Sequence, residues 1–196
     1  MNGAGMSKGR LEAFSDGVFA ILITIMVLEL KIPHGTDWGA IRHLVPVFLT
    51  YVMSYVFLGI YWSNHHHMLH ATEHISGGVL WANLHLLFWL SLVPFVTGWM
   101  GENHFAALPT AAYGLVLLMS AVSYTLLQNV ILSVQGPHSK LSVAVGRDRK
   151  GKISLVFYAL AILLAFVNQF ISDALYALVA LIWLVPDKRI EHTLSR

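Results

Sequence analysis

The chain has 196 residues, of which 57% are hydrophobic and only 11% are charged, against roughly 45–50% and about 25% in average soluble proteins. So few charged side chains exclude an ordinary water-soluble globule. A formal net charge of +2 lacks the dense basic surface expected of a nucleic-acid-binding protein. The sequence contains no cysteine, which excludes disulfide frameworks, thiolate metal sites and cysteine nucleophiles. The composition therefore indicates an integral membrane protein.

Apolar runs long enough to cross a bilayer follow one another along the chain. A bilayer core about 30 Å thick requires roughly 20 apolar residues per helix. Four runs meet this requirement, and a fifth is long enough for two short spans joined by a tight turn. We predict one all-α integral membrane domain over residues 1–196, with six transmembrane helices and no re-entrant filter loop. The predicted spans are 13–32, 43–63, 79–100, 109–134, 153–169 and 171–186.

Lysine and arginine are distributed unevenly between the two sides of this predicted membrane domain. No cation occurs between Arg42 and Lys140, and only Lys31 and Arg42 fall on the side opposite the termini. The other ten of the twelve cations share one side: Lys8, Arg10, Lys140, Arg147, Arg149, Lys150, Lys152, Lys188, Arg189 and Arg196. Because such residues concentrate in cytoplasmic loops, we predict that both termini are cytoplasmic. We interpret the loop 140–152 as a topology determinant that faces anionic lipid.

The first predicted span contains one ionisable residue, Asp16. A charged side chain in the bilayer core costs at least about 2.5–3.5 kcal/mol, so we expect Asp16 to face protein or water and to accept hydrogen bonds from neighbouring helices. A separate face of the same helix carries branched aliphatic residues and one hydroxyl at helical spacing. This face, the aliphatic stripe, comprises Gly17, Ile21, Thr24, Ile25 and Leu28. From periodicity alone, packing against a neighbouring helix is its simplest interpretation.

The segment that opens the first span resembles a family signature. Arg10, Phe14, Ser15 and Asp16 match the R-x-x-x-F-S-D pattern at the start of the first helix of the transmembrane protein 175 family, the lysosomal potassium channels and their bacterial relatives. Weaker similarities follow in the segments 61–67 and 83–95. The predicted helix number and topology also resemble one bacterial protomer, so the similarity extends over the whole chain.

The resemblance implies a homotetramer in a bacterial inner membrane, with first helices that line a potassium-conducting pore. In this family a ring of bulky aliphatic side chains forms the constriction. That ring falls here on Ile21, with Thr24, Ile25 and Leu28 lining the turns beyond it. The T-V-G-Y-G carbonyl filter of conventional potassium channels is absent from the sequence. The resemblance implies an ion channel with potassium as the permeant ion, no cofactor and no enzymatic activity.

We interpret the signature residues Arg10, Ser15 and Asp16 as scaffold rather than as filter. Asp16 points away from the aliphatic stripe on a helix that advances 100° per residue. Hydrogen-bonding partners at the same depth would come from the second and third spans. The candidates are Trp62, His66, His67 and Asn83.

A histidine cluster at the end of the second predicted span suggests a metal site as an alternative. His66, His70 and His74 follow one another at i, i+4 and i+8, and imidazole binds Zn²⁺ or Ni²⁺. Glu73 is the only carboxylate nearby, and no H-E-x-x-H motif is present. We therefore favour hydrogen bonding to Asp16 or pH sensing over metal binding.

Two further interpretations remain open at this point. A small secondary transporter of a cation or small solute is the main functional alternative, and its typical marks are inverted repeats and broken helices. Pro94 and Gly98 interrupt the third span in this manner, without a counterpart in the other half of the chain. Glu29 lies at the outer end of the first span, where a ring of four copies could concentrate cations at a pore mouth.

Overall fold

The computed structural model describes residues 7–136 and 149–184, and these residues contain helices and no strand. The helices are α1 (Lys8–Leu28), α2 (Trp38–Arg42), α3 (Val45–His70), α4 (Gly77–Ser91), α5 (Val93–Glu102), α6 (Ala107–Gln135), α8 (Arg149–Leu164) and α9 (Gln169–Leu184). The prediction of an all-helical fold is confirmed for this part of the chain.

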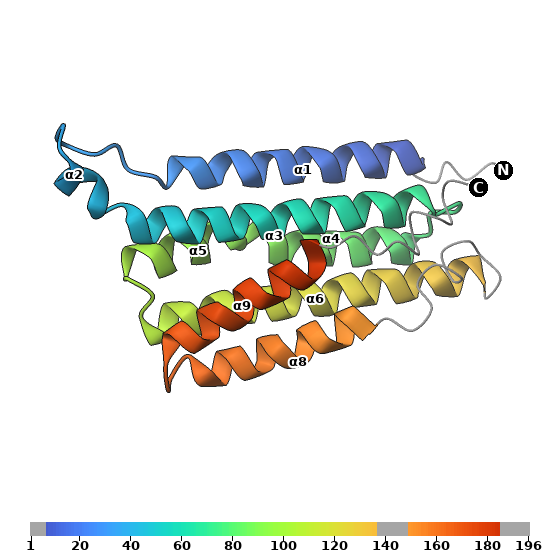
Figure 1. The fold of residues 1–196 in the computed structure, drawn as a ribbon. Coiled ribbons are helices and arrows are strands. Elements are labelled where there is room, and N and C mark those ends of the chain that lie inside the picture. The colour runs from blue at the N-terminus through green and yellow to red at the C-terminus, as the bar shows by residue number, and fades with distance from the viewer. Residues whose placement is uncertain (1–6, 137–148, 185–196) are drawn as a thin grey trace.

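The long helices lie side by side in a bundle, and α9 crosses it obliquely over α8 and α3 (Figure 1). We call the end at which α1 begins the proximal end and the opposite end the distal end. Four segments are long and apolar enough to cross a membrane: Lys8–Leu28, Val45–His70, Gly77–Glu102 and Ala107–Gln135. The helices α8 and α9 have 16 residues each, or about 24 Å at 1.5 Å per residue.

Several helix boundaries differ from the predicted spans. The helix α3 continues to His70, well past the predicted end at residue 63, because the polar cluster 63–67 remains helical. The predicted span 79–100 consists of α4 and α5, which meet at Leu92. Pro94 explains this break, since proline has no N–H and its ring clashes with the preceding turn. The short helix α2 lies in a loop for which no helix was predicted.

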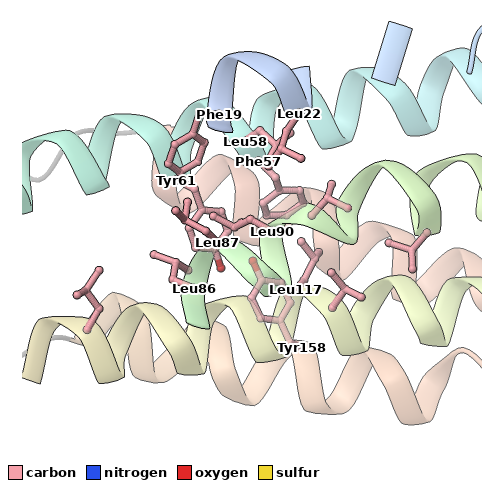
Figure 2. Close-up of a cluster of buried hydrophobic side chains, with 14 of the residues drawn as sticks. Phe19, Leu22, Phe57, Leu58, Tyr61, Leu86, Leu87, Leu90, Leu117 and Tyr158 are labelled. Carbon is pink, nitrogen blue, oxygen red and sulfur yellow. The ribbon is translucent and has the colours of Figure 1, made fainter. Parts of the chain in front are cut away.

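The core consists of apolar side chains contributed by all the long helices. Phe19 and Leu22 of α1 point towards Phe57, Leu58 and other side chains of the bundle (Figure 2). The remaining labelled members of this cluster are Tyr61, Leu86, Leu87, Leu90, Leu117 and Tyr158. This burial fixes which face of α1 is turned towards its own protomer.

Glycines permit close approach between helices in the distal half. A Cβ atom on Gly101 of α5 would lie 2.7 Å from Cα of Val47 on α3. A Cβ atom on Gly114 of α6 would overlap the hydroxyl oxygen of Tyr176 on α9. Small residues are the usual means by which membrane helices approach closely. The same region contains interhelical hydrogen bonds, for example from the Tyr176 hydroxyl to the Thr110 carbonyl at 3.1 Å.

Candidate pore helix and its supporting network

The helix α1 has one buried face and one face that no described part of the protomer covers. The buried face consists of Leu11, Ser15, Phe19, Leu22 and Met26. On the other face, Ile21 is 57% exposed, Ile25 41% and Leu28 77%. The aliphatic stripe, called the α1 stripe from here on, therefore packs against no described part of the protomer. Packing against a neighbouring helix is the wrong interpretation for the described part of the single chain. The stripe is available to another copy of the chain, to lipid or to water.

The only hydroxyl on the α1 stripe belongs to Thr24. Its Oγ1 donates a hydrogen bond to the carbonyl oxygen of Ala20, one turn earlier in the same helix. A hydroxyl has one donor and two acceptor lone pairs, so this bond uses the donor and leaves acceptor capacity on the oxygen. Because Thr24 is exposed, that oxygen can accept from water or coordinate a cation beside α1.

A buried polar network joins Ser15 of the signature to side chains of two other helices. Asn83 of α4 donates from Nδ2 to Ser15 Oγ of α1 at 3.0 Å. The Oδ1 atom of Asn83 lies 2.7 Å from Nε2 of His65 on α3. These side chains are at most 1% exposed, and the His65 ring also packs against Phe19. The network therefore fixes the rotation of α1 about its own axis.

Asp16 belongs to a second, more exposed contact between α1 and α3. The indole Nε1 of Trp62 donates to Asp16 Oδ1 at 2.9 Å. Trp62 is 46% exposed and Asp16 is half-buried. The other signature residues point outward: Phe14 is 52% exposed, and the side chain of exposed Arg10 forms no hydrogen bond or ion pair within the described residues.

Of the four partners predicted for Asp16, Trp62 alone donates to it within the described residues. Asn83 contacts Ser15 and His65 instead, and His66 and His67 take part in neither contact. His66 and His67 are exposed and form ring contacts with each other and with neighbouring side chains of α3. The structure places His65, one residue earlier, inside the protomer instead. Its position was detectable, since His65 continues the apolar spacing of Leu58, Tyr61 and Met68 on the buried face of α3.

The predicted three-imidazole face is also not formed. His66 and His70 stack with ring centroids 6.0 Å apart, but α3 ends at His70. His74 therefore lies beyond the end of the helix, so the i, i+4, i+8 spacing does not place it on the same face as His66 and His70. Within residues 7–136 and 149–184, no group of three His, Cys, Asp or Glu side chains is placed to hold a metal ion.

The distal end of α1 is held by contacts with α5. Lys31 forms an ion pair with Glu102, and the hydrogen bond and charge of Glu102 raise the pKa of Lys31. Glu29 lies against Gly98, where a Cβ atom would be 3.2 Å from Glu29 Oε2. The ion pair is solvent-exposed, so its contribution to stability is small. These contacts define the position at which the last turn of α1 meets the bundle.

Comparison with known proteins identifies the family of the chain. The model of the family described as endosomal/lysosomal potassium channel TMEM175 matches residues 10–94. A protein named potassium channel from Chryseobacterium sp. (strain P1-3) is 54% identical, over 97% of this chain and 99% of the relative. Another protein named potassium channel, from Streptomyces collinus, is 34% identical over 60% of this chain and 61% of the relative.

A solved structure extends the comparison to the fold. The crystal structure of a lysosomal potassium-selective channel TMEM175 homolog from Chamaesiphon minutus superposes with a TM-score of 0.78. The match covers 92% of this chain and 97% of that chain, at 24% sequence identity. The Arg10–Asp16 signature lies at the start of the region matched by the family model. The chain therefore belongs to the TMEM175 family, which is a family of ion channels and not of enzymes.

Proposed function

We propose that the protein is a potassium-selective or weakly selective cation channel of a bacterial inner membrane. Four copies would surround one pore, each with six transmembrane helices and cytoplasmic termini. The 54% identical relative named potassium channel, which is matched over 99% of its length, supports potassium as the permeant ion. The charge asymmetry of the sequence supports the orientation, with the proximal end in the cytoplasm.

The observation that carries this proposal is the exposure of the α1 stripe. One face of α1 is buried in its protomer while the opposite face, with Ile21 and Thr24, is open. Asp16 is also only half-buried on the surface of α1 and α3. A carboxylate is costly against lipid, so this side of the protomer is better suited to protein and water than to lipid. A tetramer with α1 innermost would turn Ile21 and Thr24 towards the pore and would keep Asp16 away from lipid.

In this arrangement Ile21 forms the constriction, and Thr24, Ile25 and Leu28 line the turns towards the distal mouth. A ring of four isoleucines in a narrow pore excludes water and blocks ions by dewetting when it is closed. When the ring is wider, the Thr24 oxygens one turn away provide acceptor atoms for a partly dehydrated cation. The buried Ser15–Asn83–His65 network sets the rotation of α1 and therefore the direction in which Ile21 points.

A secondary transporter remains the second candidate because α4 and α5 form a helix interrupted at Leu92. Interrupted helices form the substrate sites of many transporters. Here, however, the interruption is closed by packing, since Val93, Pro94, Val96 and Thr97 are buried. The described residues at the interruption are therefore packed inside the protomer.

Electrical recording of the reconstituted protein separates the two candidates. We expect single-channel currents in potassium chloride that persist without any counter-ion gradient, and a reversal potential that follows the potassium gradient. The currents should fall, and the reversal potential shift, when sodium replaces potassium on one side. Flux that requires a co-transported or exchanged solute, without resolvable unitary currents, would support the transporter and contradict the channel.

A further inference from the structure

The connection between α1 and α3 carries exposed apolar side chains at the distal end of the bundle. Trp38, the first residue of α2, is 86% exposed, and Ile32, in the segment before it, is 82% exposed. Ile41, one turn after Trp38, is 49% exposed. The helix α2 lies beyond the distal ends of α1 and α3 (Figure 1). Contiguous exposed apolar groups of this kind mark contacts with another protein or with a membrane.

The segment that carries these side chains has a defined local structure. Asp37 caps α2, since its Oδ1 accepts a hydrogen bond from the backbone N–H of Ala40 at 2.9 Å. Gly35 has a φ of 148°, which other residues rarely adopt, and a Cβ atom there would lie 3.1 Å from Cβ of Ala40. At the other end, the N–H of Leu44 donates to the carbonyl of Ile41 at 2.9 Å. The helix α2 is therefore held at both ends, with Trp38 turned outward.

The separation of α2 from α3 is explained by Pro46, which lies in the first turn of α3. Proline has no N–H, so Pro46 cannot donate to the carbonyl of Arg42, four residues earlier. That hydrogen bond would be needed to join α2 and α3 into one continuous helix. The chain therefore forms two helices at this point, instead of one helix that extends farther from the bundle.

The level of α2 relative to the bilayer follows from the apolar part of α3. Residues 45–62 contain no charged side chain, and they extend over about 27 Å at 1.5 Å per residue, close to the roughly 30 Å of a bilayer core. Val45 therefore marks the distal boundary of the hydrocarbon. Only His43 and Leu44 separate α2 from α3, which places α2 at the level of the headgroup region, about 5–8 Å thick in each leaflet.

The charges around α2 leave one cation without a protein partner. Trp38 and Arg42 are four residues apart, so they lie on the same side of α2. The side chain of exposed Arg42 forms no hydrogen bond or ion pair within the described residues. The nearby carboxylate of Asp37 caps the helix. Tryptophan is enriched at the membrane–water interface, and guanidinium groups bind phosphate oxygens well, so this side of α2 matches the headgroup region of a phospholipid.

From these observations we propose that α2 anchors the distal end of the protein to the membrane surface. The Trp38 ring lies at the boundary between acyl chains and headgroups of the distal leaflet, and the Arg42 guanidinium binds a lipid phosphate. The partner is the phospholipid surface and not a second copy of the chain. The anchor requires that the chain spans a membrane, but it does not depend on ion conduction.

The anchor is tested by electron paramagnetic resonance of a spin label at a single cysteine. Because the chain contains no cysteine, Ile41→Cys gives one label beside Trp38, and Thr36→Cys gives a control label at an exposed position before α2. The full-length protein is reconstituted in liposomes of phosphatidylcholine and phosphatidylglycerol. Molecular oxygen concentrates in the bilayer and a nickel chelate in water, so we expect a severalfold higher ratio of oxygen to nickel accessibility for Ile41→Cys. Equal ratios would place α2 in water, and shielding from both reagents would indicate a second copy; either result overturns the proposal.

Substitutions in the Ile41→Cys background separate the two parts of the anchor. Trp38→Gln should lower the accessibility ratio to that of Thr36→Cys, whereas Trp38→Tyr, which keeps an amphipathic ring, should retain it. Arg42→Gln should lower the ratio, whereas Arg42→Lys should keep it. These side chains are exposed, so the thermal unfolding temperature should stay nearly constant. An unchanged ratio in both Trp38→Gln and Arg42→Gln would contradict the anchor.

Discussion

Replacing Ile21 with alanine is expected to increase the current through the reconstituted protein while leaving its folding intact. The side chain is 57% exposed in the protomer, and substitutions at exposed positions usually change stability by no more than about 0.5 kcal/mol. If four Ile21 side chains form the constriction, alanine widens it. Each 1.36 kcal/mol removed from the barrier raises the current about tenfold, and we expect an increase of at least that size together with weaker discrimination against sodium.

The neighbouring residue provides the control for this substitution. Leu22 is 5% exposed and lies on the buried face of α1, one residue away. Leu22→Ala should destabilise the fold by about 2–5 kcal/mol, as is usual for buried leucines, without a specific change in selectivity. If Ile21→Ala lowered the thermal unfolding temperature as much as Leu22→Ala and left the current per channel unchanged, Ile21 would be a packing residue.

Replacing Asn83 with leucine is expected to destabilise the protomer by about 1–3 kcal/mol, the cost of leaving a buried polar group unpaired. Asn83 is fully buried and contacts both Ser15 and His65. Leucine has a similar size but can form a hydrogen bond neither with Ser15 Oγ nor with His65 Nε2. The thermal unfolding of the detergent-solubilised protein measures the loss.

Asn64→Leu serves as the matched control at a similar depth. The side chain of Asn64 donates only to the carbonyl of Ile60 in its own helix, so its loss should cost well under 1 kcal/mol, as for most hydrogen bonds within membranes. We also expect Asn83→Leu to destabilise the protomer more than Asp16→Ala, because Asp16 is only half-buried. Equal stability of Asn83→Leu and the wild type would show that the network does not position α1.

The sequence was most informative for side chains that are unfavourable in a bilayer and for residues that recur at helical spacing. Asp16 stood out because a carboxylate in an apolar span requires partners, and Trp62, which donates to it, was among the candidates. The α1 stripe followed from a helical spacing that the structure reproduces as one exposed face. Both inferences depend on properties of a single helix, so they required no knowledge of tertiary packing.

Other features depended on contacts that the sequence does not encode locally. The three consecutive histidines, His65 to His67, are chemically identical, so the apolar spacing of α3 was the only sequence signal that His65 faces inward. Hydropathy located the end of the second span at residue 63, because it detects the change from lipid to water rather than the end of the helix at His70. The contacts of Asn83 with Ser15 and His65 arise from packing between segments that are distant in the chain.

The central claim, that four α1 helices meet at Ile21, is tested most directly with a single cysteine. Because the chain contains no cysteine, Ile21→Cys introduces one unique thiol, and Trp81→Cys, on the 76% exposed side chain of α4, is the control. The account predicts that a water-soluble cationic thiol reagent blocks the current of Ile21→Cys channels and that oxidation links their subunits into dimers, with neither effect in Trp81→Cys. Unblocked current and no cross-linking in Ile21→Cys, with labelling only by membrane-permeant apolar reagents, would place Ile21 against lipid and contradict the pore.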